Sequence, residues 1–268
     1  MTEPAYRLVA TDLDGTLLSS AETVSDRTRA ALAAATAAGA VHIVVTGRSA
    51  PWARPVFDAI GYTGLAVCGQ GAQVYDAGAD RLLTSMTLDR RTGRLALEKL
   101  TAELGRLAVA ANQDGLEGTV LARPDYRLTV GGELPVARVG TEDELFAAPI
   151  SKLYLQHPEL DDDALAETAR RVVGDLVGVT VAGPGLVELL PLGLSKATGL
   201  AVAARRLGLR GADTIAFGDM PNDLPMFRWA RYAVAMAGAH QEVRAVADEV
   251  TAGNDEDGVA VVLERLYG

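Results

Sequence analysis

A rhythm of short apolar runs alternating with helical segments constrains this chain more than any other feature. Residues 8–10, 41–45 and 65–67 are apolar runs of strand length. An alanine-rich segment over 26–38 and a second segment that Pro51 opens lie between them, and both have helical character. Strands that alternate with helices in this way predict a parallel sheet covered on both faces.

The middle of the chain breaks this rhythm, and the rhythm returns after residue 191. A hairpin over 74–83 is followed by predicted helices over 89–104 and 161–173. Short strands are expected around them at residues 107–111, 119–122, 126–130, 150–156, 177–181 and 186–190. We therefore predict an α/β fold with a Rossmann-like parallel-sheet core and an inserted α+β module. The core would comprise residues 1–82 and 188–268, and the module residues 83–187.

Composition limits the possible partners. Hydrophobic residues make up 49% of 268 residues, which is enough for a substantial core. The net charge of −10 argues against binding to nucleic acid or to an anionic membrane surface. Cys68, the single cysteine, lies in an apolar run, and we interpret it as a core residue. With no apolar segment of roughly 18 residues for a membrane span, we expect a cytoplasmic protein.

Four polar segments stand where ligands bind in open parallel sheets, outside the carboxyl ends of the strands. Three of them follow predicted strands and one opens a predicted helix. They are Asp-Leu-Asp-Gly-Thr at 12–16, Thr-Gly-Arg at 46–48, Ser-Lys at 195–196 and Gly-Asp-Met-Pro-Asn-Asp at 218–223. Their positions predict one shared site at this edge of the sheet.

The carboxylates of these segments indicate a cation site. Asp12 and Asp14 are two residues apart, and side by side they repel unless a cation lies between them. Asp219 can add a third carboxylate from another strand end. Magnesium prefers such oxygen ligands. A calcium loop starting at Asp12 is the alternative, but its twelfth position holds Thr23 instead of glutamate.

The remaining groups indicate a phosphoryl substrate. Thr46 offers a hydroxyl, Gly47 a backbone N–H, and Lys196 a positive charge at a helix start. A metal and a lysine reduce the repulsion between a phosphate and an attacking carboxylate, which can form an acyl phosphate. Each segment alone also fits a simple turn, strand exit or helix cap. The four together favour phosphoryl chemistry.

As a set, these segments resemble the haloacid dehalogenase-like hydrolases, and more narrowly their Cof-type sugar-phosphatase branch with a type IIB cap. Residues 12–18, 46–48, 195–196 and 218–223 carry the resemblance, and the tail at 254–260 also matches. The motifs are spread over nearly the whole chain. The resemblance implies a Mg²⁺-dependent hydrolase of small phosphorylated metabolites.

The resemblance also implies roles for the acidic residues. Asp12 would be the nucleophile and a metal ligand. Asp14 would protonate the leaving oxygen and then activate water, and its backbone carbonyl would also contact the metal. Asp219 would complete the protein ligands. Asn222 and Asp223 would order these ligands from behind, with Asn222 a further candidate for direct metal contact.

Further positions would bind the substrate. Thr46, Gly47 and Lys196 would hold the phosphate, while Arg48 and Gln70 would lie on the substrate side. The branch usually has Asn-Gly-Ala after its third strand, whereas Gln70 replaces the asparagine here. The amide is kept, but it extends one methylene further.

The inserted module corresponds to the cap of this branch, because the long gap lies between Thr46 and Lys196. Such a cap, here residues 83–187, would exclude water from the reaction. Lys152, Arg123 and Arg127 are cap cations that could meet an anionic substrate, and we interpret each as a solvated charge. Two other functions share the core motifs: phosphoryl transfer between sugar positions, as in phosphomannomutases, and a phosphoaspartate sensor of the receiver kind.

Overall fold

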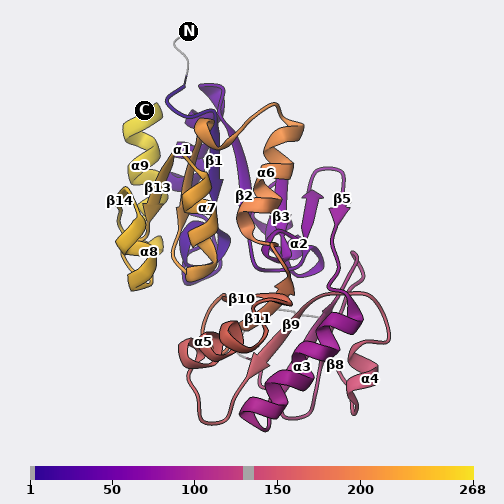
Figure 1. The fold of residues 1–268 in the computed structure, drawn as a ribbon. Coiled ribbons are helices and arrows are strands. Elements are labelled where there is room, and N and C mark those ends of the chain that lie inside the picture. The colour runs from indigo at the N-terminus through magenta and orange to yellow at the C-terminus, as the bar shows by residue number, and fades with distance from the viewer. Residues whose placement is uncertain (1–3, 129–135) are drawn as a thin grey trace.

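The computed structural model describes residues 4–128 and 136–268. Its strands form two separate sheets, and the chain passes from the first to the second and back again (Figure 1). The predicted α/β fold with an inserted α+β module is confirmed. Of the strand expected over 126–130, residues 126–128 are not in a strand and the other two lie outside the described residues.

The core sheet has β1 (Leu8–Thr11) in its interior, between β2 (Val41–Val45) and β12 (Thr214–Gly218), and both pairings are parallel. Its strand order is β14-β13-β12-β1-β2-β3-β4-β5, and the last two strands are antiparallel to their neighbours. The remaining strands are β3 (Leu65–Cys68), β4 (Gln73–Asp76), β5 (Arg81–Ser85), β13 (Tyr232–Ala235) and β14 (Glu249–Val250). The strand order reverses direction at β1, which makes its carboxyl end the favoured position for a ligand.

Helices cover both faces of the core sheet because successive strand residues point to opposite sides. Leu8 and Ala10 pack with Leu200 in one cluster, whereas Val9 packs with Val262 in another. The helices of the core are α1 (Asp26–Ala37), α2 (Ala50–Ile60), α6 (Lys196–Arg206), α7 (Leu224–Trp229), α8 (Gln241–Val246) and α9 (Gly258–Tyr267). Cys68 is buried in a third cluster on this sheet, which confirms it as a core residue.

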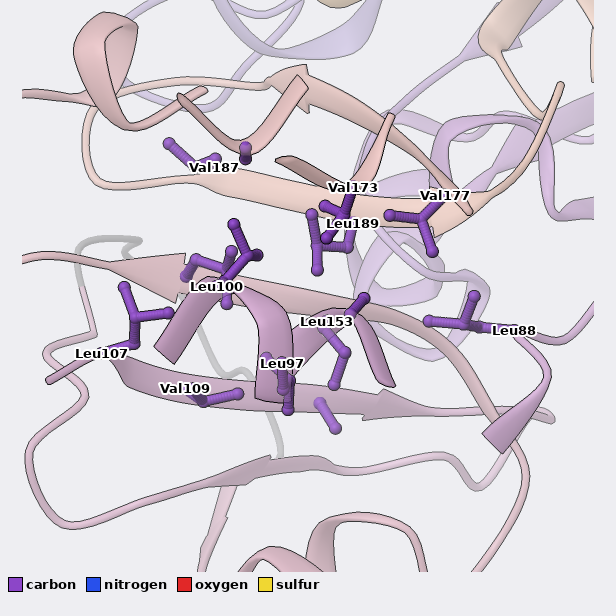
Figure 2. Close-up of a cluster of buried hydrophobic side chains, with 14 of the residues drawn as sticks. Leu88, Leu97, Leu100, Leu107, Val109, Leu153, Val173, Val177, Val187 and Leu189 are labelled. Carbon is purple, nitrogen blue, oxygen red and sulfur yellow. The ribbon is translucent and has the colours of Figure 1, made fainter. Parts of the chain in front are cut away.

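The cap has a six-stranded sheet with helices packed on one face. The sheet order is β10-β11-β9-β6-β7-β8. Leu97 and Leu100 of α3 lie over Leu153 and Val109 of the sheet (Figure 2). The elements are α3 (Arg90–Leu104), β6 (Ala108–Gln113), β7 (Val120–Ala122), β8 (Val136–Arg138), α4 (Glu142–Leu145), β9 (Ile150–Gln156), α5 (Asp162–Val173), β10 (Val177–Val181) and β11 (Val187–Pro191).

The domain boundaries expected from the sequence both fall inside strands. β5 belongs to the core sheet and continues to Ser85, beyond the expected boundary at 82/83. β11 belongs to the cap sheet and continues to Pro191, beyond the expected boundary at 187/188. We therefore propose that the two junctions lie at residues 86–87 and 192–194.

No described helix has both the length and the apolar character needed to cross a bilayer.

Candidate active site

Asp12 follows β1 directly and begins a tight loop, η1 (Leu13–Leu17). Gly15 turns this loop with a φ of 72°, in the left-handed region that favours glycine. A side chain at Gly15 would also collide with the carboxylate of Asp219. The loop is held further by Thr16, whose hydroxyl donates to Asp219 Oδ1 at 3.0 Å. The polar segments that follow β1 (Leu8–Thr11) and β12 (Thr214–Gly218) therefore meet, as the sequence indicated.

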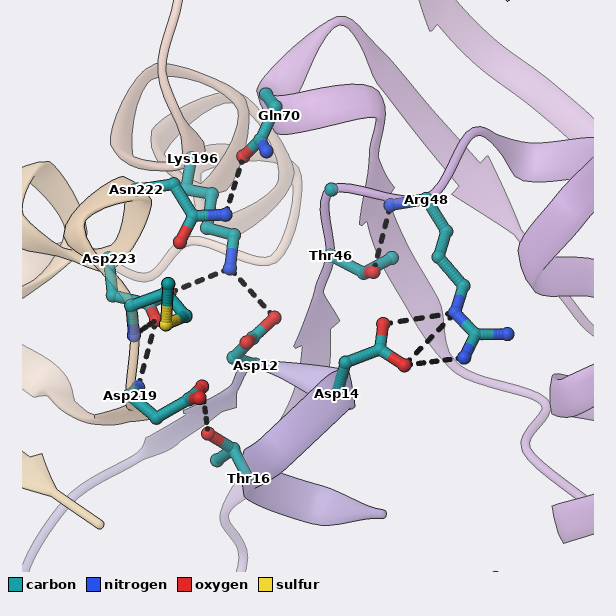
Figure 3. A network of polar contacts seen from close by, with 12 residues as sticks. Asp12, Asp14, Thr16, Thr46, Arg48, Gln70, Lys196, Asp219, Asn222 and Asp223 are labelled. Carbon is teal, nitrogen blue, oxygen red and sulfur yellow. Dashed lines mark hydrogen bonds and ion pairs between the residues drawn. The ribbon is translucent and has the colours of Figure 1, made fainter. Parts of the chain in front are cut away.

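Lys196 lies at the centre of the site. Its ammonium donates to Asp12 Oδ1 and to Asp223 Oδ1, each at 2.7 Å, and the lysine is 1% exposed (Figure 3). Burial lowers the pKa of Lys196, but the two carboxylates outweigh burial and raise it overall. The ammonium therefore stays charged. Burial raises the pKa of the Asp12 carboxyl, and Lys196 opposes that rise.

Close backbone contact places Lys196 here. It is the first residue of α6, and the Ser195 hydroxyl caps the helix by accepting from Thr198 N. Gly199 of α6 packs directly on Gly71, and a Cβ at either glycine would collide with the other segment. These two glycines let the start of α6 approach the loop after β3, which brings Lys196 to the strand ends.

Asp223 is held rigidly on a short 3₁₀ turn, η4 (Pro221–Asp223). Its Oδ2 accepts from the backbone N–H groups of Asp219 at 3.0 Å and Met220 at 3.1 Å. Gly218 makes room for this, since a Cβ there would overlap the Asp223 carboxylate. Both oxygens of Asp223 are thus engaged, which fits its expected role of orienting the residues around it.

Three carboxylates of the site together fit a divalent cation. Oxygens of Asp12, Asp219 and Asp223 lie within 4.8 Å of one another. Burial and, next, the Asp223 carboxylate raise the pKa of Asp219 to about 6. Asn222 lies beside them with a buried Oδ1 that has no hydrogen-bond partner among the described residues. Clustered carboxylate oxygens with an unpartnered amide oxygen form the hard oxygen donor set that Mg²⁺ prefers.

Asp14 points away from this cluster. Its carboxylate accepts from the Arg48 guanidinium, with 2.9 Å between Arg48 Nε and Asp14 Oδ2 (Figure 3). Arg48 also donates to Glu22 Oε1 at 2.8 Å and stacks over Trp52 at 4.8 Å. The Asp14 side chain is not part of the acidic cluster, and the expected metal contact through its backbone carbonyl stays a prediction. Sequence analysis did not identify Glu22, which no motif marks.

Thr46 and Gly47 form the wall opposite Lys196. The buried Thr46 hydroxyl accepts from Arg48 N at 3.0 Å, which tightens the turn after β2. Gly47 lies against Gln70, whose amide leaves no space for a Cβ at the glycine. Two of the expected phosphate-binding residues, Thr46 and Gly47, thus follow the end of β2, beside the nucleophile candidate that follows β1.

A buried polar chain joins the cap to this wall. Lys152 of β9 is 0% exposed, donates to the Gly47 carbonyl at 2.8 Å and forms an ion pair with Glu188 of β11. Glu188 Oε2 accepts from Gln70 Nε2 at 2.7 Å, and Gln70 Oε1 accepts from Asn222 Nδ2 at 3.1 Å. The interpretation of Lys152 as a solvated charge is therefore wrong. Glu188, the one polar residue of the run Val187–Pro191, was the available signal.

Gln70 holds this chain together in an uncommon conformation. Its φ is 62°, in the left-handed region, where a non-glycine residue costs roughly 1–2 kcal/mol. From there the Gln70 amide reaches both Glu188 of the cap and Asn222 of the core.

Several of the predicted site residues border a cavity of about 290 Å³ between the two domains. The core contributes its polar side, and the cap contributes the turn between β10 and β11. From the core come Asp12, Asp14, Gly15, Gly47, Arg48, Asp219 and Asn222, among others. Lys196, Thr46, Gln70 and Asp223 lie behind this surface.

The C-terminal tail supports the loop that follows Asp12. Asn254 Nδ2 donates to the Leu18 carbonyl at 2.9 Å, and Asp255 Oδ1 accepts from Ser20 N at 2.7 Å. Asp257 accepts from the hydroxyl of Ser25, the N-cap of α1. The tail motif noted in the sequence therefore has a structural task near the site.

Comparison with known proteins agrees with this geometry. A family model described as haloacid dehalogenase-like hydrolase matches residues 9–263. Phosphatase YwpJ of Bacillus subtilis is 30% identical over 97% of this chain and 99% of its own length. The solved phosphatase BT1666 of Bacteroides thetaiotaomicron is 27% identical with a TM-score of 0.78, covering 97% of this chain and 95% of that one.

A third similar protein is longer. The chloroplastic endoribonuclease YBEY of Arabidopsis thaliana is 28% identical over 98% of this chain but only 47% of its own length. The chain therefore spans about half of that protein. The name of the longer protein does not by itself describe the half that matches.

Proposed function

The chain belongs to the haloacid dehalogenase-like hydrolases, and from this premise we propose that it is a magnesium-dependent phosphatase of small phosphomonoesters. The phosphoryl group would pass through a phosphoaspartate on Asp12. The single observation that carries this proposal is the buried Asp12–Lys196 pair at the carboxyl end of β1, in which Asp12 lines the interdomain cavity and Lys196 holds it from behind. The phosphatases YwpJ and BT1666 support the activity by their similarity.

Asp12 is suited to attack because only one of its oxygens is engaged. Lys196 bonds Oδ1, which fixes the carboxylate and leaves Oδ2 without a hydrogen bond among the described residues. Oδ2 would form a bond to phosphorus as the bond from phosphorus to the leaving oxygen breaks. The ammonium would remain beside the phosphoryl oxygens, where its charge offsets repulsion between the two anions.

Asp14 lines the same cavity and would be the general acid and base of the reaction. It would give its proton to the leaving oxygen in the first step. In the second step it would take a proton from the water that attacks phosphorus and releases inorganic phosphate from Asp12. Arg48 keeps the Asp14 carboxylate near the cavity between these steps.

Asp12 and Asp219, with Asn222 Oδ1, would hold the Mg²⁺. When bound, the ion supplies Lewis-acid polarisation of the phosphoryl group and charge compensation. Asp223 would keep Asp219 in position by accepting a hydrogen bond from the Asp219 backbone N–H. The substrate would be a small phosphorylated metabolite, since the cavity of about 290 Å³ is at the lower end of small-molecule sites.

The test is phosphate release from a panel of small phosphomonoesters, with Mg²⁺ and then with EDTA. We expect Mg²⁺-dependent release, and no measurable turnover for Asp12→Asn, which keeps the size of the side chain. Circular dichroism would establish that this variant is folded. Retained turnover by folded Asp12→Asn would contradict the proposal.

The yield of phosphate separates hydrolysis from the alternatives. A hydrolase releases one phosphate for each substrate consumed. Conversion to an isomeric phosphate without release would instead indicate a mutase. A phosphoaspartate that survives for hours would indicate a sensor.

A further inference from the structure

The cavity has two unlike sides. The core side carries the charged groups described above. The cap side consists of the turn between β10 and β11, here called the roof: Ala182, Gly183, Pro184 and Leu186. None of these four side chains has a polar atom. The roof side chains therefore present only carbon and hydrogen to the part of a substrate that contacts them.

The backbone N–H groups of the roof are also mostly engaged within the cap. Ala182 N donates to the Leu186 carbonyl and Leu186 N to the Gly183 carbonyl, both at 3.0 Å. Gly185 N donates to Asp162 Oδ2 at 2.7 Å, and Pro184 has no N–H. Within the ranges the structure describes, Gly183 has the one roof N–H without such a partner.

Glu188 is the polar side chain that the cap adds to the cavity lining, and it has no free oxygen. Oε1 pairs with Lys152 and Oε2 accepts from Gln70. The residue is 1% exposed, so it cannot turn toward a ligand without breaking a buried ion pair. The cap residues that line the cavity thus offer no unpaired polar side chain and few N–H donors to a row of hydroxyl groups.

We infer that the enzyme selects phosphomonoesters whose leaving group turns an apolar flank, such as an aryl, cycloalkyl or short alkyl group, toward the roof. This inference rests on the proposed phosphatase function and departs from the sugar phosphates that the sequence resemblance implies. A polyol in the same place would lose hydrogen bonds to water and gain few in return. An apolar flank instead gains from the area that it buries.

Matched substrate pairs test the inference. Cyclohexylmethyl phosphate and glucose 6-phosphate share a six-membered ring, and propyl phosphate and glycerol 1-phosphate share a three-carbon chain. We expect kcat/KM to be about 10-fold or more higher for the apolar member of each pair. Equal values, or a preference for the hydroxylated members, would overturn the inference and leave the phosphatase function standing. No release from any of the four would overturn both.

Variants of the roof assign the preference to it. Leu186→Asn and Ala182→Ser each add a polar group, and each should reduce the preference by roughly 3- to 10-fold. Leu95→Asn makes the same kind of change on α3, at an exposed cap residue that does not line the cavity, and should keep the preference. Ala182→Ser remains informative if Leu186→Asn fails to fold. An unchanged preference in folded roof variants would overturn the assignment.

Discussion

Lys196 in the core and Lys152 in the cap are equally buried, yet their surroundings differ. Lys196 lies between two carboxylates, those of Asp12 and Asp223. Lys152 has one carboxylate, Glu188, and the carbonyl of Gly47. Burial lowers the pKa of both lysines, but two carboxylates overcome it at Lys196, whereas one does not at Lys152.

The difference shows how the number of neighbouring charges separates a reactive site from a structural contact. The core cluster keeps a surplus of negative charge, because Asp12, Asp219 and Asp223 surround a single ammonium. Such a surplus attracts a cation. The cap pair is neutral and leaves nothing for a ligand, so it serves to join the two domains. The predictions below test this division.

Loss of the Lys196 charge should have the largest effect. We expect Lys196→Met to lower kcat/KM by about 10³-fold, because the charge that stabilises the transferred phosphoryl group is removed. The matched control is Lys152→Met, which should lower kcat/KM by less than about 10-fold per folded molecule, since a contact to Gly47 is lost but no catalytic group. Steady-state phosphate release measures both, and equal losses would refute the division.

Loss of the Lys152 charge should appear in stability. Lys152→Met leaves Glu188 buried without a counter-charge, and we expect the free energy of unfolding to fall by about 3–5 kcal/mol. Urea unfolding at pH 7 measures it. A loss below about 1 kcal/mol, the value typical of exposed ion pairs, would show that the Lys152–Glu188 pair does not behave as a buried one.

A double variant should restore much of that stability. Lys152→Met with Glu188→Gln removes both charges and keeps an amide oxygen that can accept from Gln70. We expect it to recover at least about 2 kcal/mol of the loss, because a buried pair replaced by neutral groups is often nearly neutral in stability. A double-mutant cycle over the four proteins gives this value. Additive losses would argue against the pair as the unit of contact.

The two lysines should also differ at alkaline pH. The pKa of Lys152 is lowered in the folded state, so between that pKa and about 10.4 the unfolded chain binds more protons. Its contribution to stability therefore rises with pH in this window. The stability difference between wild type and Lys152→Met should grow from pH 7 to pH 10, as followed by thermal unfolding.

The matching difference for Lys196→Met should stay flat over the same range. The pKa of Lys196 is raised, so its contribution is complete below about 10.4 and is lost only above it. Parallel curves for the two variants would contradict the opposite directions of their shifts.

The smallest effect is expected at Gln70, which connects the two buried networks. Gln70→Asn relieves part of the left-handed strain but shortens the reach to Glu188. We expect stability to change by no more than about 1–2 kcal/mol, since one hydrogen bond is lost and some backbone strain is relieved. If Gln70→Asn lowers stability because the Glu188 carboxylate loses its hydrogen bond, this loss should disappear in the Glu188→Gln background.

Local motifs explain why much of the site could be predicted from the sequence. Asp12, Lys196 and Asp219 each follow a strand or open a helix, so short patterns locate them. The Lys152–Glu188 pair could not be found in this way, because nothing in the strand periodicity says which face of the cap sheet meets the core. The orientation of Asp14 toward Arg48 likewise depends on contacts between separate loops.

The fold shows the same limit. Long periodic elements were predicted closely, and β9 and β10 have the predicted bounds. The sequence analysis missed α8 and β14, which have six and two residues, because such lengths carry too little periodicity to recognise. The boundaries expected at 82/83 and 187/188 fall within β5 and β11, because strand residues of core and cap look alike.

The split core has a consequence for synthesis. Asp12 and Lys196 are 184 positions apart, and β12, which pairs with β1, follows later still. A ribosome that adds about 5–20 residues per second needs roughly 10–40 s to pass from one to the other. During that time the nascent chain carries the attacking carboxylate without its ammonium partner. Catalytic competence therefore arrives only with the last third of translation.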